Sequence, residues 1–181
     1  MVQIFSSFVF LLSATAAFAG PVKRDVATVK ADIATITTQT TALNNAIQAF
    51  PDSGGSLVAA LAIHNSAVTL DNTVKKTVTD VQATSPFSDA DGADILSAVE
   101  TLEPIILSAL QNIVAKKPAF QALPIGGIPA LVLQDLRNLD TDVTALSDAL
   151  IDKSPSGLLT RANEIKTTIG DAFDDAIAAY S

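Results

Sequence analysis

The chain has 181 residues, of which 49% are hydrophobic and only 5% aromatic, with no cysteine and a single histidine. Its formal net charge of −8 argues against nucleic-acid binding, which needs clustered lysine and arginine, and against electrostatic docking on anionic membranes. The absence of cysteine excludes disulfides and thiol nucleophiles, so a fold must rest on an aliphatic core.

The N-terminus has the pattern of a secretory signal peptide. A short apolar stretch at 8–12 is followed at 17–19 by Ala-Phe-Ala, the small-x-small pattern that signal peptidase accepts. The stretch is too short and too rich in serine and alanine for a transmembrane segment, which needs about 20 apolar residues. We therefore expect secretion rather than membrane insertion.

A dibasic pair, Lys23-Arg24, follows and suits a second processing cut. Cleavage there would leave 157 residues and remove two of the eleven basic residues but no acidic one, which takes the net charge to −10. That length suits one domain with a sizeable core. We expect three parts: a signal peptide at 1–19, a short pro-segment at 20–24, and a single helical domain at 25–181 that acts outside the cell or at the cell wall.

Apolar residues recur at spacings of three and four from Val26 to Phe50, which predicts an amphipathic helix that Pro51 ends. A second helix is expected over 56–83. The apolar residues of its first half occupy more than one stripe, so we expect this helix to be buried on two sides. Ser85-Pro86 ends it.

A third helix is expected to begin at a cap formed by Ser88 or Asp89. Pro104 lies in its interior, where the ring removes a backbone donor and clashes with the preceding turn, so we predict a kink there. The Lys-Lys-Pro sequence at 116–118 is expected to close the helix.

Residues 119–128 are expected to form a short turn of helix followed by a proline- and glycine-rich loop, and two further helices are expected after them. The fourth begins near Pro129 and is ended by Ser-Pro-Ser-Gly at 154–157, and the fifth carries a stripe from Leu158 to Ile177. No segment alternates as a strand would. The sequence therefore predicts an all-α bundle of five long amphipathic helices, with the third kinked at its proline.

The sequence lacks the common catalytic motifs: it contains no GxSxG elbow, no P-loop and no HExxH. His64 has no second histidine or cysteine as a partner, and a lone histidine on a largely apolar helix is usually structural. Carboxylate pairs such as Asp174 and Asp175 are explained by helix polarity and solubility. We expect no enzyme, no catalytic residue, no metal and no cofactor.

Three segments of the predicted mature chain, together with the leader and its Lys23-Arg24 pair, carry a family resemblance. They are the first helix DVATVKADIATITTQTTALNNAIQAFP, the segment NIVAKKPAFQAL, and the end of the fourth helix, DALIDKSP. In these features the chain resembles the fungal hydrophobic surface-binding protein A family, also described as cell-wall galactomannoproteins.

The resemblance implies a secreted helical domain that adsorbs to hydrophobic surfaces and, in some members, recruits polyester-degrading hydrolases. It also implies binding of long-chain fatty acids between the helices, as in related mannoproteins. Because the chain lacks the Ser/Thr-rich stalk and anchor signal of the larger mannoproteins, we expect a released protein. The family supplies no catalytic residue to carry over.

Two modes of apolar binding stay open at this point. A core of slender aliphatics with few rings can leave an apolar space between helices, and such a space accepts an apolar guest. The same composition can also give a close-packed bundle without a cavity. The protein is then either a carrier that encloses a fatty acyl chain or an amphipathic bundle that lays apolar faces on wax, polyester or a hydrophobic wall.

If a lipid is enclosed, its tail is expected to contact the second helix and the part of the third helix beside the kink. The expected wall residues are Leu61, Val68, Leu70, Leu102, Ile106 and Leu110. A buried carboxylate head needs hydrogen-bond donors, for which Ser66, Thr69 and Ser108 are candidates and His64 is the fallback. The alternative is that these aliphatics are ordinary core and the hydroxyls bond water or the backbone.

Overall fold

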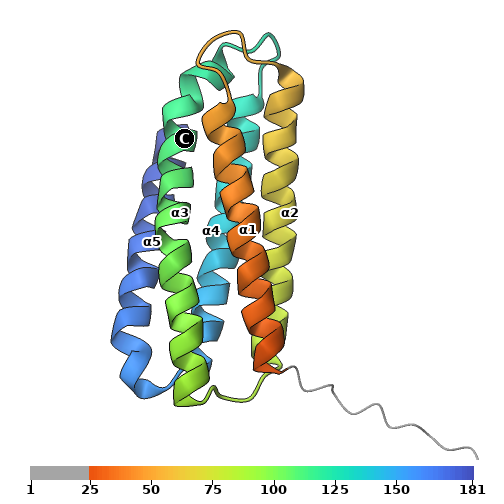
Figure 1. Ribbon diagram of the computed structural model, residues 1–181. Helices are drawn as coiled ribbons and strands as arrows, with labels where there is room; N and C mark the ends of the chain where they lie inside the picture. The colour runs from red at the N-terminus through yellow and green to blue at the C-terminus, as the bar shows by residue number, and fades with distance from the viewer. Residues whose placement is uncertain (1–24) are drawn as a thin grey trace, which may run out of the picture.

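Capping residues and turns rich in glycine or proline divide residues 25–181, the part of the chain that the computed structural model describes, into five long α-helices (Figure 1). The elements in chain order are α1 (Val26–Ala49), α2 (Leu57–Gln82), α3 (Asp89–Gln121), α4 (Ile128–Lys153), the 3-10 turn η1 (Ser156–Leu158) and α5 (Leu159–Tyr180). No strand occurs in this range, which confirms the predicted all-α five-helix fold. The expected signal peptide and pro-segment lie outside the described residues.

The helix starts follow from local chemistry. The side chains of Asp25, Ser56 and Ser88 each accept a hydrogen bond, 2.9–3.1 Å long, from the backbone amide three residues further on. Such caps satisfy amides that have no partner inside the helix. Ser88 is thus the cap of α3. α4 starts after Gly127, whose φ of +99° is a left-handed conformation that favours glycine.

α3 runs through both of its prolines and ends only at Gln121, so the expectation that residues 116–118 close the helix is wrong. Pro118 removes a single amide donor, whereas the turn beyond it is held by packing. Phe120 is 1% exposed, and its ring centroid lies 4.6 Å from that of Phe50. α3 also continues through Pro104, and the kink at that residue stays a prediction.

The five helices form a closed ring. Each makes extensive contacts with two others, in the cyclic order α1, α2, α4, α5, α3 and back to α1. Figure 1 shows the same arrangement, with α1 in front, α4 behind, and α2 and α5 at opposite sides. Five cylinders in a ring leave a wider axial space than four. The ring therefore favours an interior cavity wherever the inward side chains do not fill the axis.

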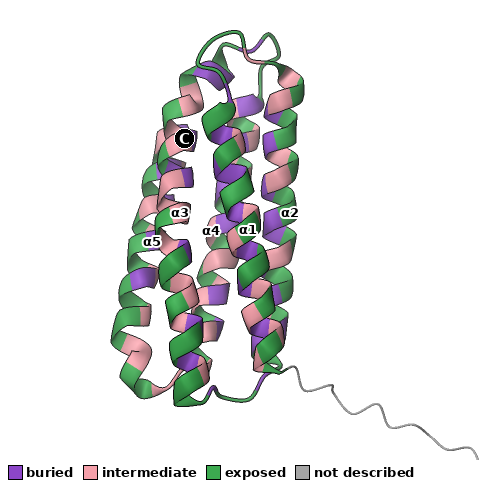
Figure 2. Cartoon of the chain, viewed as in Figure 1, coloured by how far each residue is buried: buried purple, intermediate pink, exposed green. Residues whose placement is uncertain are grey.

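Each helix buries one inward stripe and exposes its outer face (Figure 2). The expectation that α2 is buried on two sides is wrong, because Leu61 and Val68 are each 39% exposed and Val58 is 79% exposed. Within the ring α2 packs mainly against α1 and α4, so nothing in the described chain covers its second apolar stripe. None of the helices within residues 25–181 combines the length and apolarity needed to cross a bilayer.

Candidate ligand-binding site

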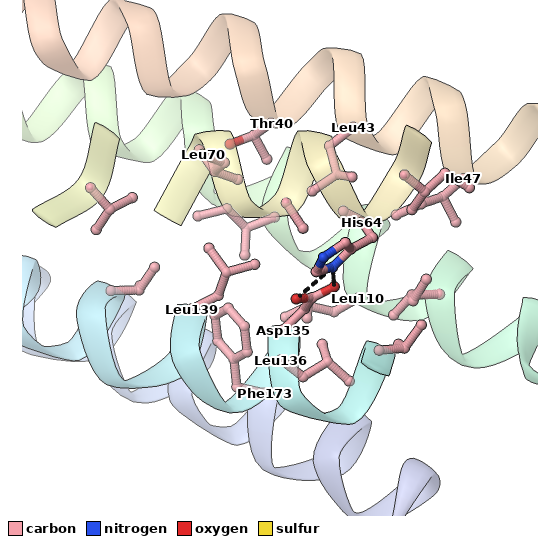
Figure 3. A pocket seen from close by; sticks show the side chains of 18 of the residues that line it. Thr40, Leu43, Ile47, His64, Leu70, Leu110, Asp135, Leu136, Leu139 and Phe173 are labelled. Carbon is pink, nitrogen blue, oxygen red and sulfur yellow. Dashed lines mark hydrogen bonds and ion pairs between the residues drawn. The ribbon is translucent and has the colours of Figure 1, made fainter. Parts of the chain in front are cut away.

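An apolar cavity lies on the axis of the ring (Figure 3). It offers about 80 Å³ to the centres of water-sized molecules, which is room for several such groups. All five helices contribute to its wall. Residues of the wall include Ile36, Thr40, Leu43, Ile47, Ile63, His64, Leu70, Val74, Ile106, Leu110, Val132, Asp135, Leu136, Leu139, Val143 and Phe173.

The cavity extends across the middle of the bundle and is displaced toward one end. Its wall reaches Ile47 near the end of α1, Ile63 in the second turn of α2 and Val132 in the second turn of α4. These positions are nearest the end that carries the α1–α2 and α3–α4 loops (Figure 1). A chain-like guest would therefore lie closer to this end than to the end where α1 begins.

Among residues 25–181, only three polar side chains line the cavity: Thr40, His64 and Asp135. The Thr40 hydroxyl donates to the carbonyl oxygen of Ile36 at 2.8 Å, so its proton is already used within α1. His64 Nδ1 lies 2.8 Å from Asp135 Oδ2 and 3.0 Å from Oδ1, which links α2 to α4 (Figure 3). The wall thus presents a single polar pair on an otherwise apolar surface.

This pair is largely removed from solvent, with 26% of the His64 side chain and 12% of the Asp135 side chain exposed. Burial raises the pKa of Asp135, the hydrogen bond and charge of His64 oppose this, and the nearby Asp71 carboxylate adds to it. The contact uses the Nδ1 atom of the imidazole. It leaves Nε2 as the ring atom that can meet a polar group of a ligand.

Four of the ten residues expected to bind a ligand line the cavity: His64, Leu70, Ile106 and Leu110. Leu102 is buried at 6% exposure but lies one to two turns further toward the start of α3 and is not part of the wall. The structure does not bring it into the same site.

Two exposed residues of α2, Leu61 and Val68, also lie outside the cavity wall. Their neighbours Ser66 and Thr69 donate to carbonyl oxygens four residues back in the same helix, at 3.0 and 2.8 Å. Both hydroxyl residues line a surface groove between α1 and α2 instead. The outer face of α2 thus holds four of the ten expected residues.

Ser108 belongs to a small polar network between α1 and α3. Its hydroxyl accepts hydrogen bonds from Asn44 Nδ2 at 3.1 Å and from Asn112 Nδ2 at 3.3 Å, and Asn112 also donates to the Asn44 side-chain oxygen at 2.8 Å. Asn44 is buried at 8% exposure. The Ser108 oxygen is the acceptor in these bonds, which gives Ser108 a role in joining the two helices.

The sequence-based site omitted Asp135 and the faces contributed by α1, α4 and α5, such as Leu43, Leu139 and Phe173. One signal was available: Asp135 is the first charged residue after Lys117, so it follows a long uncharged stretch and falls on an apolar stripe. A charge in such a place is unusual unless it is paired. The partner itself, 71 residues away, could not be read from spacing.

No group of three or more histidine, cysteine or carboxylate side chains with the arrangement of a metal site occurs between residues 25 and 181. The polar pair of the cavity can donate to or accept from a ligand head group. The rest of the wall offers only apolar contact.

Comparison with known proteins shows the family and the fold that the chain shares. Residues 26–152 match a protein family described as hydrophobic surface binding protein A. A curated relative, cell wall mannoprotein 1 of Aspergillus fumigatus, is 29% identical over 178 residues. That alignment covers 97% of this chain and 60% of the relative, so the chain spans less than two thirds of the relative's length.

Two solved structures share the fold. The crystal structure of AFMP4P in complex with palmitic acid has a TM-score of 0.80 and 33% identity, over 87% of this chain and 100% of that one. Ligand binding domain 2 of the Penicillium marneffei MP1 protein, complexed with multiple arachidonic acids, has a TM-score of 0.77 and 24% identity, over 88% and 98%. At 24% identity, the similarity to the MP1 domain concerns the fold alone.

Proposed function

Because this chain belongs to the hydrophobic surface-binding protein A family, we propose that it is a secreted, non-catalytic protein that holds a long-chain fatty acid or similar lipid between its helices. The observation that carries the proposal is the apolar cavity to which all five helices contribute. The 33% identical structure with palmitic acid supports the choice of a fatty acid as the ligand.

The dimensions of the wall suit an extended acyl chain. On α1 the lining runs from Ile36 to Ile47, on α2 from Ile63 to Val74, and on α4 from Val132 to Val143. Each of these pairs is separated by 11 residues, which corresponds to roughly 16 Å of helix at the α-helical rise. Three helices thus provide apolar walls of equal length, which a long methylene chain can follow.

The head group of such a ligand would lie at the His64–Asp135 pair. A carboxylate buried without a donor is costly, and this pair is the polar feature of the wall that can meet it. Asp135 holds Nδ1, so Nε2 is the ring nitrogen left to form a hydrogen bond with the ligand carboxylate. Leu70, Ile106 and Leu110 would then contact the tail, in place of the outward residues of α2.

A matched pair of variants tests the carrier directly. Ile106→Asp puts a charge on the cavity wall at a half-buried position, where the helix can still fold. Leu61→Asp puts the same charge on the exposed face of α2. After removal of lipid, palmitate binding measured by calorimetric titration is expected to vanish in the first variant and to persist in the second. Equal binding by both would place the ligand elsewhere.

The runner-up function is adsorption to hydrophobic solids followed by recruitment of a secreted hydrolase. Exposed aliphatic side chains such as Val58 and Ile125 favour the adsorption step, because burying them against an apolar phase removes them from water. Recruitment rests on the family resemblance alone. Co-sedimentation of a secreted polyester hydrolase with protein-coated polyester beads would test it, and hydrolase that stays in solution would contradict it.

We also propose that the protein acts outside the cell or at the cell wall, after cleavage at Ala19 and Arg24. The N-terminal sequence of the secreted protein tests this, with Asp25 expected as the first residue. A protein retained inside the cell would contradict the proposed location.

A further inference from the structure

Charged residues are unevenly distributed along the chain. Between Asp32 and Asp71 the only charged side chain is Asp52, apart from the histidine, although the interval covers most of α1 and half of α2. Between Glu103 and Asp135 the only charged side chains are two adjacent lysines. Most of the acidic residues therefore lie in the remaining parts of the chain.

The fold brings these two intervals to the same end of the bundle. The α1–α2 loop and the α3–α4 loop lie side by side at the top of Figure 1. We call this region, residues 50–61 and 122–130, the low-charge end. The opposite end holds the starts of α1 and α3, with Asp25, Asp89 and Asp91.

The charges of Asp52, Lys116 and Lys117 near the low-charge end have partners. Lys116 Nζ lies 2.6 Å from the Asp52 carboxylate. Lys117 donates to the carbonyl oxygen of Ala179 near the C-terminus of α5 and lies 5.5 Å from the centre of the Tyr180 ring. An approaching apolar phase would therefore desolvate few uncompensated charges, which lowers the cost of contact.

The low-charge end also carries three of the four exposed large aliphatic side chains of the described chain. Val58 is 79% exposed, Ile125 is 53% exposed and Leu61 is 39% exposed. Residues 122–130 contain no charged residue at all. The cavity is displaced toward this end of the bundle, so a lipid taken from an apolar phase here would have a shorter path inward than from the opposite end.

We propose that the low-charge end is the docking surface by which this domain meets an uncharged hydrophobic solid, with the helix axes standing away from the surface. The acidic opposite end then stays in water. This inference rests on the surface-binding part of the proposed function, but it does not require that the cavity holds a fatty acid.

Adsorption to alkyl-coated silica beads tests the proposal. The variant Val58→Lys with Ile125→Lys adds two charges at the low-charge end, and Ser85→Lys with Ser156→Lys adds two at exposed positions of the opposite end. A third variant, Val58→Ala with Ile125→Ala, removes apolar area without adding charge. Circular dichroism and palmitate titration of every variant check folding and the cavity.

The low-charge-end lysine variant is expected to lose about tenfold or more in affinity for the beads. Each lost aliphatic side chain reduces the apolar area buried on the bead, and each added lysine charge must be desolvated. The alanine variant should lose less, and the opposite-end variant should adsorb within about twofold of the native protein. Palmitate binding should be unchanged in all three.

Three outcomes would overturn the proposal. Native-like adsorption by the low-charge-end variants would exclude this surface. An equal loss in the opposite-end variant would assign adsorption to net charge. A native dimer that the low-charge-end variant converts to a monomer, measured by light scattering, would make the end an interface between copies. Failure of palmitate binding with end-dependent adsorption would instead refute only the carrier.

Discussion

His64 and Asp135 are the residues on which the proposed binding of a ligand head group depends most. The sequence nominated His64 only as a fallback, because a lone histidine on an apolar stripe usually has a structural role. The case for His64 as a binding residue is stronger in the structure, because the Asp135 carboxylate lies 2.8 Å from His64 Nδ1 at the cavity wall. Pairings between distant helices cannot be read from spacing, which is why half of this site was missed.

Removing the pair should weaken binding of the acid without affecting the apolar contacts. In His64→Leu with Asp135→Asn no buried carboxylate is left alone, so the fold is spared that penalty. A hydrogen bond to a charged group contributes roughly 1.5–3 kcal/mol, so palmitate affinity should fall about tenfold or more. Methyl palmitate, which has no carboxylate, should bind both proteins equally in a fluorescence displacement assay.

Thr40→Val serves as the matched control for this prediction. Thr40 also lines the cavity, but its hydroxyl proton is bonded to the Ile36 carbonyl, so palmitate affinity should stay the same. A loss of palmitate affinity in Thr40→Val, or an undiminished palmitate affinity in the double variant, would contradict the assignment of the head group to His64.

The serine and threonine candidates do not line the cavity, and their hydroxyls are hydrogen-bonded elsewhere. Hydroxyls within helices readily donate to the carbonyl oxygen four residues back, as Ser66 and Thr69 do. Sequence shows that a hydroxyl is present but not whether its proton is already used. Ser108 instead accepts hydrogen bonds from the Asn44 and Asn112 side chains.

At the scale of single elements, α3 shows what periodicity can and cannot predict. Its apolar stripe and its Ser88 cap were readable, whereas its end was placed too early at residues 116–118. A proline weakens a helix locally, but burial of Phe120 outweighs that cost. Packing with partners distant in sequence decides such boundaries.

The last turn of α3 supplies a stability prediction. Phe120→Ala should lower the free energy of unfolding by about 3–5 kcal/mol, because it removes a fully buried ring that packs on Phe50. Denaturant unfolding followed by circular dichroism measures this. The exposed Pro118→Ala is the control and should not destabilise the protein. A loss below 1 kcal/mol in Phe120→Ala would show that this turn is not held by the core.

α4 carries carboxylates whose surroundings disfavour their charge. Burial raises the pKa of Asp140, and Asp174 on α5 adds to the rise. A carboxyl group whose pKa is higher in the folded state than in the unfolded state binds more protons when the protein is folded. Its contribution to the free energy of unfolding therefore falls as the pH rises from the ordinary pKa of 3.8 through the raised pKa. Asp140 therefore costs stability at neutral pH.

Asp140→Asn is accordingly expected to raise the free energy of unfolding at pH 7, by about 0.5 kcal/mol or less because the group is partly exposed. Below the ordinary pKa of 3.8 the difference from the native protein should disappear. Urea unfolding at both pH values measures it. A difference that grows toward acid pH would have the wrong sign for this account.

At the scale of the whole molecule, the sequence predicted five helices but not their order around the axis. Periodicity shows which stripe of a helix is buried and leaves open which helix it meets. The cyclic order α1, α2, α4, α5, α3 decides the rest. It makes Leu43, Leu136 and Phe173 neighbours across a cavity and leaves Leu61 and Val68 outside it.

The same topology brings the two intervals of low charge together at one end of the bundle, which their positions in the sequence do not reveal. Asp52 and the stretch after Lys117 are far apart along the chain, yet both fall at the end nearest the cavity. The proposed docking end adjoins an apolar cavity, an arrangement that would suit a protein that takes a lipid from a surface and shields it from water.

Native mass spectrometry of the protein as it is secreted, combined with lipid extraction, tests the central claim most directly. The account predicts a mass that exceeds that of the chain by one long-chain fatty acid at near one per protein, and recovery of that acid in the extract. A protein of apo mass that also fails to take up added palmitate or arachidonate would contradict it.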